Sequence, residues 1–421
     1  MTRDHTTADW HIQVPAPDQV RAYMLPMLLA FGEAFSEAEV DDWLKLGEPD
    51  RWLGAFGEEG SELVVGCATA HSMRLTVPGG EVAAAAVTGV GVRPDHRRRG
   101  ILRALMRRQL VDVHERGEPV AVLWASEGAI YGRFGYGLAA WDGFCEVDTT
   151  RTAFAAEEPL EGVVRIVDEV AAAQLIPAVY DAMRTRTPGA LSRSETWWRS
   201  GTLADPEYSR HGASPKYRVV FEADGQAEGY AIYRVKEDWD HRGPRNVLKV
   251  SEAVWTTPRA LRGLWRYLFD VDLVRTVEIH RAPVPNPLQL VLAEPRALGL
   301  VAGDGLWVRI VDLPAALGAR RYGTADELVL DVRDEFCPWN AGRWRLRSDG
   351  EPGVATAQLV ATDARADLAL DAADLAAVYL GGVRPSELAA ASRVVELASG
   401  GLRRADAMFA AERAPWCVTM F

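Results

Sequence analysis

The sequence contains little cysteine. Its four cysteines, Cys67, Cys145, Cys337 and Cys417, are spread over 421 residues, and no two of them form a CxxC pair. Zinc ribbons, thioredoxin-type redox sites and disulfide frameworks need cysteines that lie close together or recur at set spacings. We therefore expect a reducing compartment and no metal site.

Long apolar segments and a targeting signal are also missing. The amino-terminal MTRDHTTADWHIQ has no apolar core of the signal-peptide type, and no run approaches the roughly 18 apolar residues of a membrane span. An apolar fraction of 48% with 25% charged residues is ordinary for globular protein and excludes disordered and fibrous classes. We predict a soluble, cytoplasmic protein with no membrane span.

Basic charge is in deficit. The chain has 47 Lys and Arg against 59 Asp and Glu, a net charge of −12 with histidine neutral. This balance argues against nucleic acid as a partner, because neutralising phosphates needs clustered Lys and Arg. An excess of acids suits a cationic substrate better.

Apolar patterning divides the chain into several domains, as its length leads us to expect. The first region alternates strand-like and helical segments in the order typical of an α/β unit with parallel pairing. Its expected elements are a helical stretch at 20–46, strands at 62–71 and 83–92, a helix at 101–113 and a strand at 120–124.

The second region repeats this order after a candidate linker at 149–162, which indicates an internal duplication. Its expected elements are strands at 216–222, 226–235 and 248–256 and a helix at 258–269.

The third region has an α+β layout with expected strands at 306–311, 327–332, 342–347 and 357–361 and helices at 372–380, 385–391 and 401–410. Its last residues, AERAPWCVTMF, are apolar enough to lie tucked in. We predict domains at 1–152, 153–300 and 301–421.

The most informative segment is VGVRPDHRRRGIL at 90–102. A strand leads into three consecutive arginines, and a helix begins after Gly100. Free N–H groups, the helix dipole and guanidinium groups together suit an anion. The alternative is a solvated basic loop. Neither GxxxxGKS nor GxxxxGKT is present, and the glycines at 89 and 91 make a poor dinucleotide fingerprint because Pro94 replaces the third glycine.

The pattern V-x-V-x-P-x-H-R-R-R-G-I-L-R resembles the acetyl-CoA motif of the GNAT N-acetyltransferase superfamily. Arg97 and Gly100 match that motif, whereas Leu102 departs from its last small residue. A second segment, ASEGAIYGRFGYG at 125–137, narrows the resemblance. With the tandem layout and the carboxyl-terminal Phe421, the whole chain resembles the enhanced-intracellular-survival (Eis) family of aminoglycoside acetyltransferases.

The resemblance implies an α/β (α+β) architecture of two GNAT folds, the second degenerate, followed by a sterol-carrier-protein-like domain, and assembly as a homohexamer. It also implies that the first domain binds acetyl-CoA, with the pantetheine arm along the strand and the pyrophosphate at the basic loop. The cofactor-binding residues are then Val90, Gly91, Val92, Arg97, Arg98, Arg99, Gly100, Ile101, Leu102, Arg103, Ser126 and Glu127.

The same resemblance makes Tyr131 the general acid and the α-carboxylate of Phe421 the general base. A tyrosine of pKa ~10 can protonate a thiolate of similar basicity. An α-carboxylate of pKa ~3.3–3.7 is a weak base, but it is negatively charged at neutral pH. We therefore expect it above all to attract the ammonium form of the substrate. Without the family, a packed aromatic ring and a frayed end are the ordinary alternatives.

The same resemblance implies that Phe31, Glu33 and Trp43 bind the substrate, because they fall where the family's amine pocket has an aromatic residue, an acid and a tryptophan. The alternative is an amphipathic surface helix with Trp43 in the core. His96 is either a base or metal ligand, or, as we favour, a loop histidine with a local hydrogen bond.

The second domain lacks the basic loop. Placing Trp255 on Val92 puts Gly263 on Gly100, and the apolar Ala260 and Leu261 then replace the arginines. This domain is therefore predicted to shape the cleft or an interface and not to bind CoA.

These observations predict an acetyl-CoA-dependent N-acetyltransferase that acts on amines of small polycationic, aminoglycoside-like molecules by direct attack in a ternary complex. Two alternatives stay open: acetylation of lysine side chains in proteins, and a non-catalytic carrier of CoA or lipid.

Overall fold

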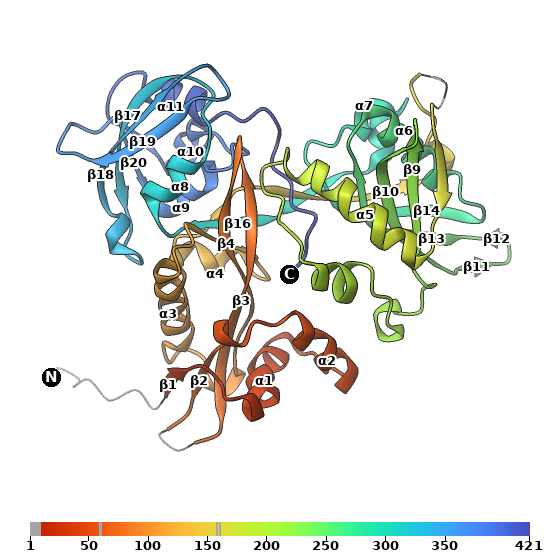
Figure 1. Ribbon diagram of the computed structural model, residues 1–421, viewed down its shortest axis with the longest axis horizontal. Helices are drawn as coiled ribbons and strands as arrows, with labels where there is room; N and C mark the ends of the chain where they lie inside the picture. Colours follow the sequence, from red (N-terminus) through yellow and green to blue (C-terminus); the bar gives the residue numbers. More distant parts are fainter. Residues whose placement is uncertain (1–9, 59–60, 157–158, 160) are drawn as a thin grey trace.

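The computed structural model describes residues 10–58, 61–156, 159 and 161–421. The chain forms three lobes, and its carboxyl terminus lies between them near the centre of the molecule (Figure 1). The prediction about the amino terminus rests largely on residues 1–9, which lie outside the described residues. Residues 157, 158 and 160 of the candidate linker also lie outside the described residues.

The predicted strands at 83–92 and 120–124 are neighbours in the first sheet, and the predicted helix at 101–113 connects them. The order of this sheet is β1-β2-β3-β4-β5-β16-β6, and only β4 and β5 are parallel. The strands are β1 (His11–Gln13), β2 (Leu53–Phe56), β3 (Val64–Val77), β4 (Gly80–Val92), β5 (Val120–Trp124), β6 (Gly137–Leu138) and β16 (Leu306–Ile310). Helix α3 (Ile101–Glu115) connects β4 to β5, as a parallel pair requires, and the short α4 (Gly128–Tyr131) follows β5.

The continuous helical stretch predicted at 20–46 is wrong. The structure has α1 (Val20–Phe31) and α2 (Glu37–Leu46) in its place. Gly32 ends α1 in the left-handed region at φ 69°, and Ser36 then caps α2 by accepting a hydrogen bond from the Glu39 N–H. Apolar spacing alone missed these stop and start signals.

The second sheet repeats the antiparallel strands followed by a parallel pair, which supports the predicted duplication. Its order is β15-β7-β14-β13-β10-β9-β8, with β13 and β14 parallel and joined by α6 (Pro258–Phe269). The strands are β7 (Trp141–Asp148), β8 (Val163–Ile166), β9 (Tyr217–Ala223), β10 (Gln226–Lys236), β13 (Asn246–Trp255), β14 (Val274–Ala282) and β15 (Val301–Asp304). Helix α5 (Glu169–Arg184), the short α7 (Leu288–Val291) and the pair β11 (Trp239–Asp240) and β12 (Gly243–Pro244) complete this lobe.

Three strands pair outside the consecutive ranges expected from the sequence. Strand β7, within 1–152, joins the second sheet, and so does β15 at the start of 301–421. Strand β16, also within 301–421, joins the first sheet. β16 runs antiparallel to β5 from Leu306 opposite Trp124 to Ile310 opposite Val120. This pairing gives β5 a second hydrogen-bonded neighbour, so the parallel pair lies inside the sheet and not at an edge.

The third sheet has the order β19-β18-β17-β20-β21, and every strand and helix predicted from residue 306 onward is present. The strands are β17 (Asp326–Arg333), β18 (Gly342–Asp349), β19 (Thr356–Ala361), β20 (Leu368–Asp371) and β21 (Val395–Glu396). The helices are α8 (Leu313–Ala319), α9 (Ala372–Val378), α10 (Pro385–Ala390) and α11 (Gly401–Phe409).

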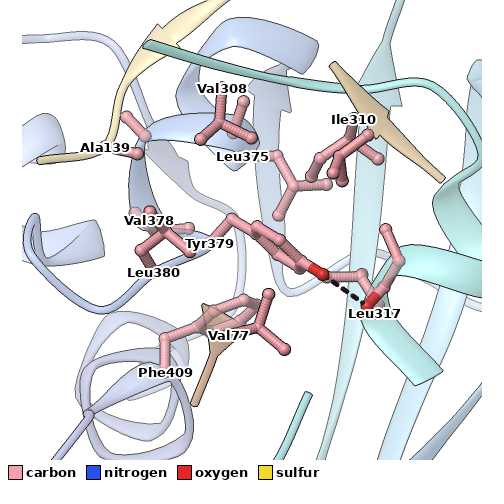
Figure 2. Packing of buried hydrophobic residues seen from close by; sticks show 14 of the residues in the cluster. Val77, Ala139, Val308, Ile310, Leu317, Leu375, Val378, Tyr379, Leu380 and Phe409 are labelled. Atoms are coloured by element: carbon pink, nitrogen blue, oxygen red, sulfur yellow. Dashed lines mark hydrogen bonds between the residues drawn. The ribbon is translucent and has the colours of Figure 1, made fainter. Parts of the chain in front are cut away.

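One hydrophobic core joins the first and third lobes. Val308 and Ile310 of β16 pack in a cluster with Leu375 and Val378 of α9 (Figure 2). α9 also approaches β6 so closely that a Cβ on Gly137 would lie 1.9 Å from the Ala373 carbonyl oxygen. The third lobe is thus fixed on the first sheet.

A buried ion pair reinforces this junction. Arg309 on β16 donates to both carboxylate oxygens of Asp334 at 2.8 Å, and the two side chains are 0% and 1% exposed. The same carboxylate accepts the backbone N–H groups of Phe336 and Cys337. Removing one charge of such a pair leaves the other buried without compensation.

We expect Asp334→Asn to lower the free energy of unfolding by about 3–5 kcal/mol, because it leaves the Arg309 guanidinium buried and unpaired. Asp331→Asn is the matched control. Asp331 pairs with Arg343 at 3.8 Å on the surface, where a salt bridge contributes about 0–1 kcal/mol. Denaturant unfolding monitored by tryptophan fluorescence measures both variants, and equal midpoints would contradict the assignment.

Candidate active site

The parallel strands β4 and β5 separate at one end. Their ladder pairs only Ala84, Ala85 and Ala86 with Val120, Ala121 and Val122, although β4 continues to Val92. Among the described residues, no strand pairs with the rest of β4 on the β5 side. This stretch includes Val90, Gly91 and Val92, so the backbone predicted to receive the pantetheine arm borders an open split in the sheet.

A β-bulge in β4 bends the strand at this split. Thr88 pairs with Thr69 and Gly91 with Cys67, so Gly89 and Val90 together face the single residue Ala68. Gly89 has φ 58°, a left-handed value that suits glycine. Bulges increase local twist and redirect strands, which accounts for the divergence of β4 from β5.

Neighbouring elements satisfy the groups that the bulge disturbs. The Tyr23 hydroxyl of α1 donates to the Ala68 carbonyl at 2.8 Å, and Gln109 of α3 donates to the Thr69 carbonyl at 2.9 Å. A Cβ on Gly91 would lie 2.6 Å from the Cα of Met27, so only glycine admits the close packing of α1. Both helices therefore fix the bent strand.

The basic loop lies where β4 ends and α3 begins. Arg98 is held at φ 63°, a strained value for a side chain, and Gly100 precedes the helix at φ 83° without any side-chain cap. Arg97, Arg98 and Arg99 are exposed, and none forms an ion pair with another described residue. Uncapped N–H groups beside unpaired guanidinium groups are suited to bind an anion.

The other predicted cofactor residues differ in exposure. Ile101 is buried in the core between α3 and the sheet, so only its backbone can face a ligand. Leu102 is half-buried, and Arg103 lies over the Phe336 ring at 5.7 Å. Ser126 and Glu127 are exposed between β5 and α4.

His96 has the local hydrogen bond that we favoured. Its Nδ1 lies 3.0 Å from the Asp95 carboxylate, which also accepts two hydrogen bonds from Arg93 at 3.1 Å. Arg93 and then His96 hold the pKa of Asp95 well below its usual range. This cluster organises the loop.

The second lobe has no counterpart of the basic loop. Trp255 ends β13 as Val92 ends β4, but α6 begins at Pro258, so two residues replace the eight of the first lobe. Gly263 therefore lies inside α6, and its predicted equivalence to Gly100 is wrong. Thr257 caps α6 by accepting from the Ala260 N–H, which leaves its N-terminus without the free site that α3 has.

The carboxyl-terminal segment reaches the split in the first sheet. The Thr88 hydroxyl on β4 donates to a main-chain oxygen of Phe421 at 3.1 Å, and the Trp124 indole on β5 donates to the Thr419 carbonyl at 3.0 Å. The Thr419 side chain bonds the hydroxyl of Tyr180 at 2.8 Å and accepts from Arg193 at 3.0 Å, both in the second lobe. The segment thus joins all three lobes.

A cavity of about 440 Å³, called the central cavity here, lies around this terminus. Phe421, Thr88, His71 and Trp43 line it from the first sheet, α2 and the carboxyl-terminal segment, and residues of the second lobe form the opposite wall. Of the three residues predicted for the amine pocket, Trp43 lines the cavity. Phe31, 49% exposed, and Glu33, also exposed, lie at the end of α1 and are not among its lining residues.

Tyr131 ends α4 and is 7% exposed. Its ring packs edge-on against Tyr136 with centroids 5.9 Å apart, and no described residue hydrogen-bonds its hydroxyl. Burial, with a contribution from Glu127, raises the pKa of Tyr131 to about 12. The hydroxyl therefore keeps its proton at neutral pH.

The sequence did not predict that Thr88, Trp124 and Thr419 hold the carboxyl-terminal segment at the site. Each is an ordinary strand or tail residue whose partner lies about 300 positions away along the chain. The available signal was the apolar tail itself, which was expected to be tucked in.

Three families match the chain in order. Residues 16–139 and residues 189–310 each match an acetyltransferase (GNAT) domain, and residues 313–418 match the sterol carrier protein domain. These matches confirm the predicted fold class of two GNAT domains followed by a sterol-carrier-protein-like domain.

Relatives match along nearly the whole chain. A Streptomyces avermitilis protein named as an uncharacterized N-acetyltransferase is 41% identical over 96% of this chain and 98% of its own length. N-acetyltransferase Eis of Mycobacterium tuberculosis is 37% identical over 84% of each chain. The crystal structure of Eis1 from Mycobacterium abscessus matches with a TM-score of 0.83 at 32% identity, over 98% of this chain and 100% of that chain.

A GCN5-related N-acetyltransferase from Anabaena variabilis shows the same fold, with a TM-score of 0.83 at 21% identity over 98% of this chain and 100% of that chain. In the part of the chain that the structure describes, no helix has the length and apolar character to cross a bilayer. Nor do three His, Cys, Asp or Glu side chains gather there as ligands for a metal.

Replacing both Arg97 and Arg98 with Gln should raise the Kd for coenzyme A by roughly tenfold or more, because each lost charge-assisted hydrogen bond costs about 1.5–3 kcal/mol. Titration calorimetry measures this. Arg108→Gln on α3 is the matched control, since Arg108 is neutralised by Asp112 at 2.7 Å. Unchanged affinity in the double variant would exclude the basic loop as the pyrophosphate site.

Proposed function

The chain belongs to the Eis family of GNAT N-acetyltransferases, and we propose that it transfers the acetyl group of acetyl-CoA to an amino group of a small molecule by direct attack in a ternary complex. One observation carries this proposal: the terminus at Phe421 lies at the split between β4 and β5, beside Thr88. A thioester and an amine could therefore meet at that split.

The residues at the split fit acetyl-CoA. The uncapped α3 and the three unpaired arginines would hold the pyrophosphate, and the open β4 backbone from Val90 to Val92 would pair with the amides of the pantetheine arm. Acetyl-CoA supplies its acetyl group as a thioester, whose carbonyl carbon bonds to the amine nitrogen while the bond to sulfur breaks.

Tyr131 is proposed to donate its hydroxyl proton to the departing sulfur. A proton donor must hold its proton at the working pH, and the raised pKa of Tyr131 ensures this. Because its hydroxyl has no hydrogen bond to a described residue, it is available to a ligand.

Phe421 is proposed to attract the ammonium form of the substrate through its α-carboxylate and to accept the proton that the amine loses. The Thr88 hydroxyl orients this group. Attraction of the ammonium needs only charge and position, whereas proton acceptance also needs exclusion of water from the central cavity.

Acetylation of aminoglycoside-like polycations, acetylation of lysine side chains, assembly as a homohexamer and a cytoplasmic location stay predictions. The carboxylate of Phe421 would favour either class of amine, because both present an ammonium group. A non-catalytic carrier is no longer a candidate, since the relatives that establish the family are N-acetyltransferases.

Tyr131→Phe should lower kcat roughly 100-fold or more, because it removes the proton donor. With native enzyme, kcat/KM should rise with pH as the amine deprotonates. Any decrease caused by deprotonation of Tyr131 should begin only above about pH 11, one unit under the pKa of Tyr131. Thiol release from acetyl-CoA measures both.

Tyr136→Phe is the control for that variant. Tyr136 touches Tyr131, and its own buried hydroxyl has no hydrogen-bond partner in the described part of the chain, so its loss should leave kcat nearly unchanged. If Tyr131→Phe keeps native kcat, Tyr131 is not the acid.

Adding two residues after Phe421 should reduce kcat/KM at least about tenfold, because the α-carboxylate is moved away from Thr88. The same two residues added at the amino terminus should have no effect. A fully active extended chain would exclude the terminal carboxylate from the reaction.

A further inference from the structure

The second-lobe wall of the central cavity is basic. The four cations Arg193, Lys216, Arg234 and Arg281 line it beside one carboxylate, Glu252. The terminus at Phe421 lines the cavity from the carboxyl-terminal segment. The excess of acids in the whole chain therefore does not describe this wall. These cationic side chains would repel a polycation bound in the central cavity.

Two of the cations are already neutralised. Arg193 donates two hydrogen bonds to Glu252, at 2.9 and 2.7 Å, and both side chains are buried. Burial opposes ionisation of Glu252, but Arg193 outweighs it and lowers the pKa of the carboxyl. Arg234 pairs with Asp205 at 2.7 Å.

The other two cations have no carboxylate partner within ion-pair distance among the described residues. Lys216 donates to the Thr202 and Ala204 carbonyls at 2.8 and 2.5 Å. Burial and the neighbouring Arg234 lower its pKa to about 8. Arg281 donates to the Ser251 carbonyl at 3.1 Å, and its buried Nε has no hydrogen-bond partner among the residues that the structure describes.

A second cavity of about 240 Å³, called the basic chamber here, continues from this wall. The two cavities share Ser209, Arg234, Ser251 and Arg281. No carboxylate is among the described lining residues of the basic chamber. Its remaining lining includes three further cations, Arg210, Lys236 and Lys249, and the imidazoles of His211 and His280. Burial and then Arg281 lower the pKa of His280, so its ring adds no charge at neutral pH.

Carboxylates behind the wall neutralise only part of this charge. Asp205 pairs with Arg210 at 3.4 Å as well as with Arg234, and Glu278 lies 3.4 Å from Lys249. Among the described residues, Lys236 and Arg281 have no carboxylate within ion-pair distance. A positive charge in a partly enclosed cavity attracts an anion more strongly than the same charge on an open surface, because water screens it less.

We propose that the acceptor amine also carries an anionic group, a carboxylate or a phosphate, which the basic chamber holds while the amine lies beside Phe421. This rests on the proposed function, because the position of the amine is taken from it. A zwitterionic or anionic amine matches both ends of the connected cavities: the carboxylate of the terminus faces its ammonium, and Arg281 and Lys249 face its anion. A polycation matches only the first end.

Matched amines test the substrate class. Thiol release from acetyl-CoA is measured with ω-amino acids, ω-aminoalkyl phosphates, α,ω-diamines and n-alkylamines, each over a series of chain lengths, together with an aminoglycoside. At the best length, kcat/KM for an aminocarboxylate or aminophosphate should exceed that for the diamine at least about tenfold, as one charge-assisted hydrogen bond implies. Comparing the two acids separates a carboxylate from a phosphate. A diamine or aminoglycoside that reacts better than both overturns the proposal.

Variants locate the effect. Lys249→Gln with Arg281→Gln should bring the ratio of kcat/KM for the anionic amine over the alkylamine close to one. Lys236→Gln with Lys249→Gln is a second pair, which replaces one exposed and one half-buried lysine and leaves Arg281 in place, and it should lower the same ratio. Arg333→Gln on the exposed surface of β17 removes the same kind of charge and should leave it unchanged. Equal ratios in all of these variants overturn the proposal.

A binding measurement separates the two proposals. Inorganic phosphate and glutarate are titrated into protein saturated with coenzyme A, which fills the basic loop of the first lobe. Binding by native protein that is lost with Lys236→Gln and Lys249→Gln supports the anion site even if no amine releases thiol, in which case the proposed function alone fails. The absence of binding by native protein overturns the anion site whatever the turnover.

Discussion

The divergence of β4 from β5 is the constraint on which the rest of the site depends. A parallel pair that stayed hydrogen-bonded along its length would leave no backbone for a ligand and no opening for the chain terminus. The bulge at Gly89 and Val90 produces the divergence, and the close approach of α1 to Gly91 makes it permanent. β4 ends three residues after Gly89, and the basic loop follows it into α3, so the split and the basic loop both adjoin the bulged end of one strand.

Delivery of the carboxyl terminus to this split depends on how the lobes are joined. β16 completes the first sheet next to β5 and carries the third lobe with it, and the buried pair of Arg309 and Asp334 fixes the junction. From there the last residues run between the first and second lobes, held by Trp124 and Arg193. Because strands are exchanged between the regions, the three lobes cannot move independently. Independent lobes could not hold the terminus at the split.

Local features of the fold and site could be predicted from the sequence, and features that depend on distant pairing could not. The strand, basic loop and helix at 83–113 were visible because alternation, consecutive arginines and a glycine all lie within one segment. The exchange of β7 and β16 was hidden, because the apolar pattern of a strand does not say which sheet receives it. The register that placed Gly263 on Gly100 failed because it assumed loops of equal length. Net charge did not predict the basic side chains on the second-lobe wall of the central cavity, since a sum over the chain carries no positions.

Charge in this protein is therefore arranged by lobe. The first lobe carries arginines without a described ion pair beside an uncapped helix, and the terminus at Phe421 places a carboxylate at the split. The second lobe lines the central cavity with cations. In the proposed function these three groups face a phosphate, an ammonium and an anionic acceptor. The central claim is that these groups meet at one split in one sheet. A crystal structure with coenzyme A bound tests it most directly. The account predicts the pyrophosphate at Arg97–Gly100 and the thiol in the split, facing Phe421. Coenzyme A in the second lobe, or a thiol that faces away from the terminus, would contradict it.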